Sequence, residues 1–343
     1  MYKNPVYADN PQMANWPISG KNRAIFTDDD AEKIVSDVRF VRPRYVKVKN
    51  KKTGKVSYAI NGGPYIEVGD FFYTSSDGNQ RAVRKSSLFT WTSKMSCPSF
   101  SPPAGPTKEY GTCPASVEAA VESEGGYLQY HQPLSERPAD QIYICKTCYA
   151  GKGNYLYPSV SIGQRIRWAW TKKTLREGSF VDQIVEAIEF LQDPSIEELL
   201  LKKMVSNKYF RIHDAGDFLT TDYYMAWIEI CQRLKNIRFW APTRQWVFEK
   251  WRKTFADAPP PTNLALRPSA LFTTAVPPDI DGMAAGTTSM DEKSAPRAMA
   301  SGKMPQNLKN CPAYEGDAEH SCAAARCRTC WDQKDTPVNY KTH

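Results

Sequence analysis

The chain has 343 residues, nine cysteines and a formal net charge of +8 at pH 7. This length exceeds one average domain but fits a single α/β domain with a small appendage. No apolar run approaches the roughly 18 residues of a membrane span, and the N-terminus lacks the apolar core of a signal peptide. These features exclude a membrane-spanning or secreted protein and predict a cytoplasmic one without a membrane partner.

Residues 1–90 are predicted to form a basic β-hairpin region, ahead of an α/β domain over residues 91–343. Strands are expected at residues 45–49 and 55–60, then at 65–68 and 71–73 leading to 81–84, with turn residues between the hairpin arms. The first hairpin region carries a run of basic residues without an acid: Arg39, Arg42, Arg44, Lys47, Lys49, Lys51, Lys52 and Lys55. Interleaved with tyrosines, these residues suit a nucleic-acid partner, whereas a lysine-rich edge strand is the alternative.

From residue 142 onward, apolar strands and amphipathic helices alternate. In chain order we expect a strand at 142–144, helices at 159–176, 180–192 and from Ser195, a strand at 209–213, a helix at 222–234, a strand at 237–241, a helix at 245–255, and strands at 263–267 and near 286–288. Such alternation favours parallel strands. The predicted fold is α/β, an incomplete parallel (β/α) barrel with Cys-rich metal-binding loops.

Eight of the nine cysteines fall into two groups in the sequence. The first group, within residues 97–148, is Cys97, Cys113, Cys145 and Cys148; the second, within residues 311–330, is Cys311, Cys322, Cys327 and Cys330. Because thiols stay reduced in the cytoplasm, metal or cluster ligation is the expected role of both groups. The ninth cysteine, Cys231, shares a predicted helix face with Trp227 and is expected to be a buried small hydrophobe.

Four thiolates suit either zinc or an iron–sulfur cluster. Each group has one CxxC motif plus two single cysteines, rather than the paired CxxC knuckles of a zinc ribbon, and this spacing favours a [4Fe–4S] cluster over zinc. His131 or His320 could replace one cysteine in either group. Zinc stays open as the alternative.

Several motifs together resemble the phage gene-product-88 family over residues 95–332. They are Cys-Pro at 97–98, Cys113, Cys-x-x-Cys-Tyr-Ala at 145–150, Phe-Arg-Ile-His-Asp-Ala-Gly-Asp-Phe at 210–218, Arg-Phe-Trp-Ala-Pro-Thr-Arg at 238–244, and the C-terminal cysteine group. The resemblance implies a phage protein in the host cytoplasm.

This family is in turn distantly similar to radical-SAM barrels. That similarity implies a cluster at the Cys-rich loop and S-adenosylmethionine as a further cofactor, with Tyr149, Gly216 and Asp217 as cofactor-binding residues. Radical-SAM enzymes use three cysteines and leave one iron open. This chain offers four, so a cluster bound by all of them would leave no iron free.

Candidate catalytic residues follow two predicted strands: His213, Asp214 and Asp217 after one, and Arg244 after the next. Carboxylates and a histidine suit acid/base chemistry, and an arginine suits a phosphate or carboxylate. Residues at a strand end commonly take part in catalysis. The alternative is a purely structural role, in which Asp217 caps a turn and His213 packs at the barrel rim.

Three functions therefore stay open. The first is an iron–sulfur enzyme on a radical-SAM-like barrel that acts on a nucleotide or nucleic acid. The second is a zinc-stabilised transferase that exchanges or modifies a base, with Asp214 or Asp217 as nucleophile. The third is a non-catalytic, metal-stabilised protein that binds nucleic acid, so whether the chain is an enzyme is itself open.

Overall fold

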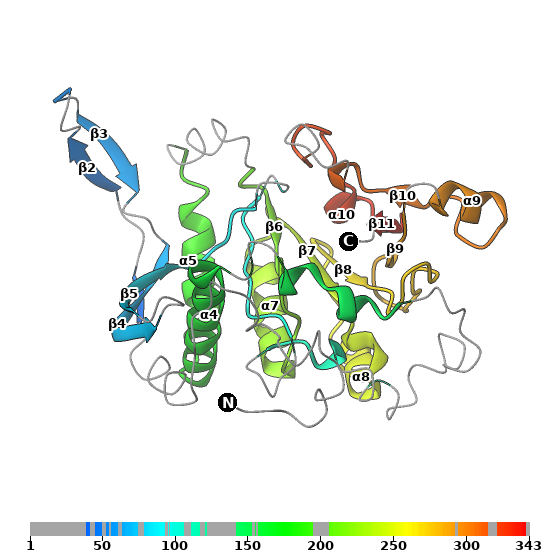
Figure 1. Ribbon diagram of the computed structural model, residues 1–343, viewed down its shortest axis with the longest axis horizontal. Helices are drawn as coiled ribbons and strands as arrows, with labels where there is room; N and C mark the ends of the chain where they lie inside the picture. Colours follow the sequence, from blue (N-terminus) through cyan, green and yellow to red (C-terminus); the bar gives the residue numbers. More distant parts are fainter. Residues whose placement is uncertain are drawn as a thin grey trace.

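The computed structural model describes residues 39–41, 45–49, 53–54, 56–60, 64–74, 79–92, 95, 97–105, 111–116, 121, 142–152, 155, 157–194, 206–291, 294–314 and 321–340 (Figure 1). Within these ranges, no helix is long and apolar enough to cross a membrane. Several features predicted from the sequence lie outside the described residues: His131, His320, Arg42, Arg44, Lys51, Lys52, Lys55 and the helix expected from Ser195.

Both predicted β-hairpins are confirmed. Strands β2 (Tyr45–Lys49) and β3 (Val56–Ile60) pair antiparallel, and so do β4 (Tyr65–Thr74) and β5 (Gln80–Ser87), with β1 (Arg39–Val41) on the other edge of β4. Figure 1 shows the β2–β3 hairpin projecting away from the rest of the described chain. Successive side chains of a strand point to opposite faces, and the alternating apolar and basic residues of Tyr45–Lys49 match that period of two.

A three-stranded parallel sheet, ordered β6-β7-β8, forms the centre of the larger part of the chain. Its elements are β6 (Tyr209–Arg211), α7 (Thr221–Arg233), β7 (Arg238–Thr243), η8 (Gln245–Val247), α8 (Glu249–Asp257) and β8 (Leu264–Pro268). Helices α4 (Pro158–Arg176) and α5 (Phe180–Phe190) precede the sheet and pack with α7. The predicted strand and helix alternation is therefore confirmed over residues 158–194 and 206–268.

The predicted barrel is wrong: the described strands form small separate sheets and no closed or nearly closed barrel. Beyond β6, the neighbouring chain contributes only a single parallel bridge, Ser99 to Arg211. That segment includes Pro98, Pro102 and Pro103. The Pro98 carbonyl accepts from the Arg211 amide and the Phe100 amide donates to the Arg211 carbonyl, both at 3.1 Å, but Pro102 and Pro103 have no N–H with which to continue this ladder. The sheet therefore ends at β6.

The strand expected at residues 142–144 is also wrong. Only Tyr143 makes a bridge, antiparallel to Phe272, and the chain then turns into the short 3-10 helix η5 (Ile144–Thr147). The hydroxyl of Thr147 donates to the carbonyl of Ile144 at 3.2 Å, which stabilises this turn. The first CxxC motif thus lies on consecutive 3-10 turns and not at the end of a barrel strand.

Aromatic side chains fill the space between the sheet and its helices. Phe180, Phe210 and Trp227 are fully or almost fully buried and contact one another or Phe100 at ring-centroid distances between 5.8 and 6.2 Å. Edge-to-face aromatic pairs contribute about 0.5–1.5 kcal/mol each beyond the burial of their area. This packing holds the parallel sheet at a fixed position under the loops that follow its strands.

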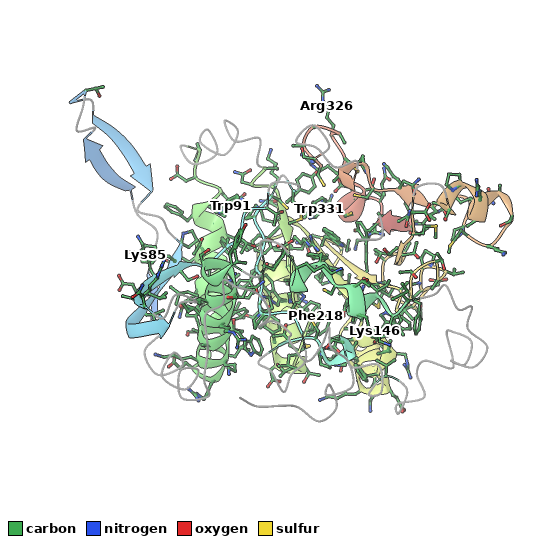
Figure 2. All side chains as sticks on the ribbon, viewed as in Figure 1. Lys85, Trp91, Lys146, Phe218, Arg326 and Trp331 are labelled. Carbon is green, nitrogen blue, oxygen red and sulfur yellow. The ribbon has the colours of Figure 1, made fainter. Side chains whose placement is uncertain are left out.

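A C-terminal lobe packs beside β7 and β8 (Figure 1). It contains β9 (Thr287–Ser289), α9 (Ser294–Ala300), β10 (Lys309–Asn310), η9 (Pro312–Tyr314), α10 (Thr329–Asp332) and β11 (Val338–Tyr340), with a small parallel sheet ordered β10-β11-β9. The indole N–H of Trp331 donates to the carbonyl of Phe210 at 3.0 Å, and this bond joins the lobe to β6. Figure 2 labels Trp331 at this junction.

Candidate functional site

A cavity of about 1580 Å³ lies at the carboxyl ends of β6, β7 and β8. This volume exceeds the roughly 300–1,000 Å³ of ordinary ligand pockets. Its walls also include β5, α4, the 3-10 turns after Tyr143 and part of the C-terminal lobe. The cavity brings together these predicted site residues: Cys113, Cys145, Cys148, Tyr149, His213, Asp214, Gly216, Asp217, Arg244, Cys311, Cys322 and Cys330. Cys97 and Cys327 do not line it.

Three thiols of the first cysteine group share one wall of the cavity. Cys113 precedes η3 (Pro114–Ser116), and its amide N–H donates to the carbonyl of Gly105 at 2.9 Å. Cys145 and Cys148 lie on and directly after η5. Burial raises the pKa of the Cys113 thiol, and the neighbouring Asp217, Cys148 and Cys145 raise it further.

Arg244 supplies positive charge to the same wall. Burial raises the pKa of the Cys148 thiol, whereas a backbone hydrogen bond and the cations of Arg244 and Lys152 lower it. Burial lowers the pKa of the Arg244 guanidinium. The charges of Cys145 and Cys148 raise it by more, so the pKa of Arg244 lies above its ordinary value. Arg244 Nε donates to the carbonyl of Ala270 at 3.2 Å, which fixes the direction of the guanidinium.

Cys97 lies with the C-terminal cysteines and not with the first group. It packs in a separate apolar cluster with Trp240, Cys330 and Trp331, and Cys311 packs against the same cluster. Burial raises the pKa of the Cys97 thiol, Cys322 raises it further, and Arg211 and Arg328 lower it. Spacing along the sequence grouped Cys97 with Cys113, but the fold separates them.

Neither cysteine group is a preformed ion site. In the part of the chain that the structure describes, no group of three or more His, Cys, Asp or Glu side chains is arranged to hold a metal ion. The prediction of Cys-rich metal-binding loops is therefore wrong for the thiols as they are arranged in the described residues. Apart from Cys97, their thiols nevertheless line the cavity wall or a small void in the C-terminal lobe.

Asp217 is buried and its carboxylate accepts several hydrogen bonds. Oδ1 accepts from the amide of Phe218 at 2.8 Å and from the hydroxyl of Thr243 at 2.7 Å, and Oδ2 accepts from the amide of Arg244 at 2.9 Å. Burial raises the pKa of the Asp217 carboxyl to about 6, although these bonds and the charge of Arg244 oppose the shift. Asp217 therefore ties the loop after β6 to the end of β7.

Gly216 is required by close packing. Its φ angle is +85°, in the left-handed region, and a Cβ atom built there would lie 2.5 Å from Thr112 Oγ1 and 2.6 Å from Pro102. Only glycine fits such a position without strain. The contact with the 102–112 segment gives Gly216 a structural role, independent of the cofactor contact that the family resemblance implies.

Asp214 belongs to a hydrogen-bonded network inside the cavity. Its Oδ2 accepts from the hydroxyl of Tyr155 at 2.6 Å, and its Oδ1 accepts from Arg211 Nη1 at 3.1 Å. Tyr149 donates its hydroxyl to the Asp214 carbonyl and accepts from Arg211 Nη2 at 3.3 Å. The guanidinium of Arg211 also lies over the Trp240 ring, 4.4 Å from its centroid.

His213 is almost completely buried, and its basicity is low. Burial and the nearby charge of Arg211 lower its pKa to about 3. Nε2 lies 3.2 Å from the hydroxyl of Tyr223, and the buried Nδ1 has no hydrogen-bond partner among the described residues. A histidine with such a pKa stays neutral at pH 7, so it could serve only as a weak base.

Arg211 and Tyr155 were missed by the reasoning from sequence. A charged side chain inside the apolar strand β6 was the one available signal for Arg211, because an arginine in a buried strand needs a partner. Tyr155 gave no signal, since its partner Asp214 lies far from it along the chain.

Comparisons with known proteins agree on one family. The family model described as Gene product 88 matches residues 73–333. The Gene 88 protein of Mycobacterium phage D29 is 31% identical over 107 residues, which are 31% of this chain and 42% of that protein. The Gene 88 protein of Mycobacterium phage L5 is 29% identical over the same length and the same shares.

The chain thus aligns with less than half the length of these two phage relatives. No solved structure matches it. The family match includes all the residues that line the cavity except Tyr340, together with both cysteine groups. The chain belongs to the Gene product 88 family of phage proteins.

Proposed function

We propose that this chain is a cofactor-dependent enzyme that acts on a nucleotide, or on a base of a nucleic acid, inside the cavity. The cofactor is a thiolate-bound metal centre at Cys113, Cys145 and Cys148, an iron–sulfur cluster first and zinc second. The observation that carries the proposal is the cavity wall, where three thiols, Arg244 and Asp217 meet although they come from separate segments.

The donor set supports a thiolate centre at that wall. Thiols bind metals as thiolates, and a nearby cation stabilises the thiolate form. Arg244 and Lys152 lower the pKa of the Cys148 thiol. Cys145 and Cys148 in turn raise the pKa of Arg244, as expected for attraction between a guanidinium and thiolates. An iron–sulfur cluster would supply electron transfer there, and zinc would supply a Lewis acid.

The size and lining of the cavity support a nucleotide as substrate. Aromatic side chains, including Tyr149, Tyr155 and Trp240, line it together with Arg244 and Lys152. Aromatic faces stack on bases, and arginine pairs with phosphate. S-adenosylmethionine, itself a nucleoside derivative, belongs among the ligands to test. The basic β2–β3 hairpin would bind the backbone of a larger nucleic-acid substrate.

The carboxylates are suited to positioning and proton transfer. Both oxygens of Asp214 and of Asp217 already accept hydrogen bonds, which lowers their value as nucleophiles in a base-exchange reaction. With a pKa of about 6, Asp217 can exchange a proton close to neutral pH. The Arg211–Asp214–Tyr155 network would hold the opposite side of the substrate in place.

Anaerobic purification of the full chain tests the cofactor. We expect a brown protein with broad absorbance near roughly 400 nm and bound iron and sulfide. Cys148→Ser should lose this absorbance, whereas Cys231→Ser, which changes a buried cysteine outside the cavity lining, should keep it. A preparation without metal, or equal metal content in the two variants, would contradict the proposed cofactor.

Equilibrium dialysis against mononucleotides, short single-stranded oligonucleotides and S-adenosylmethionine tests the substrate class. Arg244→Gln should weaken binding of the ligands that carry phosphate at least tenfold, because a buried charge-assisted pair contributes about 1.5–3 kcal/mol. If no ligand of these classes binds the metal-loaded protein, the nucleotide proposal is wrong.

A further inference from the structure

A second set of thiols surrounds a void in the C-terminal lobe, outside the first thiol group. Cys311, Cys322, Cys327 and Cys330 all line this void of about 10 Å³. Cys311 follows β10, and its amide donates to the carbonyl of Asn339 at 2.9 Å. The amide of Cys327 donates to the carbonyl of Cys322 at 2.9 Å, which closes the loop between these two cysteines.

The size of the void selects among thiolate-bound metals. A volume of about 10 Å³ is close to one water-sized sphere. A single ion has comparable dimensions, whereas a cluster of four irons and four sulfides needs several times that space. Four thiolates around one ion is the usual ligand set of structural zinc. The void therefore favours zinc here, in contrast to the large cavity, whose volume accommodates a cluster and a substrate.

A buried arginine without a direct ion pair lies beside these thiols. Arg267 is fully buried, and no carboxylate among the described residues forms an ion pair with it. Its guanidinium donates instead to backbone carbonyls of Ala285, Thr329, Cys330, Gln333 and Thr336, at 2.6 to 3.1 Å. Burial lowers the pKa of Arg267, and the negative charges of Cys330, Tyr340 and Asp335 raise it, so a thiolate at Cys330 would stabilise this buried cation.

Arg328 adds a second cation beside the thiols and lowers the pKa of Cys322, which burial raises. Its Nη1 donates to the carbonyls of Cys322 and Cys327 at 3.1 and 2.9 Å. Its guanidinium lies over the Tyr209 ring, 5.1 Å from the centroid. Both arginines thus bond to the backbone of the cysteine residues themselves, at Cys330 for Arg267 and at Cys322 and Cys327 for Arg328.

We propose that Cys311, Cys322, Cys327 and Cys330 hold one zinc ion as thiolates, and that Arg267 and Arg328 balance its charge. One Zn²⁺ with four thiolates carries two negative charges, which match the two guanidinium groups. Binding releases the thiol protons to solvent and involves no change of oxidation state. Because the thiols are not arranged to hold an ion as they stand, zinc binding must turn them into the void.

The role of this zinc is structural. Residues 311–330 contribute Cys311, Cys322 and Cys330 to the cavity lining. A zinc ion that joins β10, the 322–327 loop and α10 would fix this lobe against β7 and β8, to which Arg267 already bonds it. Zinc binding would then stabilise one wall of the substrate cavity without taking part in the reaction.

Metal analysis of the full-length chain tests the proposal. The informative variant is Cys327→Ser, because Cys327 lines the void but not the large cavity. Wild type and the control Cys231→Ser should each retain one zinc per chain, and Cys327→Ser should lose it. With Co²⁺ in place of zinc, thiolate-to-cobalt absorption should appear in wild type and disappear in Cys327→Ser.

A variant of Arg328 and a control variant of Arg326 test the charge-balancing role. Arg328→Gln should lower zinc affinity, measured by competition with a chelator, about tenfold, as is usual for groups that support metal ligands. Arg326→Gln should leave it unchanged, because Arg326 is exposed and points away from the lobe in Figure 2. Equal loss in both variants would remove the charge-balancing role.

Other outcomes would overturn the zinc site itself. Wild type without zinc, or Cys327→Ser with its full zinc content, would contradict it. Iron and sulfide that persist in Cys148→Ser but vanish in Cys327→Ser would place a cluster in the void and refute zinc. The zinc proposal and the proposed cavity cofactor can fail independently. Cys148→Ser should lose the cavity cofactor and keep one zinc per chain, and this result distinguishes the two.

Discussion

Replacing His213 with phenylalanine should remove a large part of the acid sensitivity of this protein. Burial and Arg211 lower the pKa of His213 to about 3, from its ordinary value of 6.5. The unfolded chain therefore takes up a proton at this histidine below pH 6.5, whereas the folded chain does not. Stability from this group is complete above pH 6.5 and is lost as the pH falls from 6.5 toward 3.

The magnitude follows from the width of that window. A pH of 4.5 lies two units below the pKa of the histidine in the unfolded chain, whereas the histidine in the folded chain is still neutral. The free energy of unfolding of wild type should therefore be lower at pH 4.5 than at pH 7 by about 3 kcal/mol through this group. His213→Phe should not show this loss. At pH 7 it should be less stable than wild type by about 1–3 kcal/mol, because the Tyr223 hydroxyl loses its partner.

Urea unfolding followed by tryptophan fluorescence at pH 7 and 4.5 measures both effects. Tyr223→Phe is the matched control, because it removes the same hydrogen bond and keeps the titrating histidine. It should lose stability at both pH values and retain the wild-type dependence on pH. If His213→Phe loses as much free energy between pH 7 and 4.5 as wild type, burial does not keep this histidine neutral and the reasoning fails.

Further predictions concern other groups. Burial raises the folded pKa of Asp217 to about 6, so this carboxyl alone should add about 3 kcal/mol to the stability of wild type as the pH falls from 7 to below 4, which offsets much of the loss through His213; Asp217→Asn should lack this contribution in the same unfolding assay. Gly216→Ala should cost about 3 kcal/mol or more in urea unfolding, whereas Gly302→Ala, with a positive φ but open space, should cost about 1 kcal/mol; similar costs would refute the packing role of Gly216. If the β2–β3 hairpin binds nucleic acid, changing Lys47 and Lys49 to Gln should flatten the salt dependence of binding by roughly two units, and an unchanged slope would mean that it does not.

The sequence determined most of the local structure between residues 158 and 268. Amphipathic periodicity placed α4, α5 and α7 within a residue or two of their observed ends, and apolar runs placed β6, β7 and β8. These signals are local, because a helix or strand buries its own apolar side chains at a fixed period. The family resemblance was also available from sequence, since it rests on short motifs of fixed order.

Tertiary structure alone decided where the sheet ends and which thiols meet. The ladder beyond β6 stops after the bridge at Ser99, since Pro102 and Pro103, which follow it, have no N–H to donate. Cys97 lies only 16 residues before Cys113, yet the fold packs it with Cys330, far along the chain. Spacing within a sequence limits which thiols can approach, but it does not select among them.

The same holds for the buried charges. Nothing near Arg267 in the sequence indicates that it bonds to the carbonyls of residues 329–336, or that it lies beside the C-terminal thiols. Local periodicity determines helices and strands because the interactions involved are between near neighbours. Sites such as this cavity and its cysteine lobe are assembled from distant segments, so only the packing of the whole chain determines which charges, thiols and carboxylates come together.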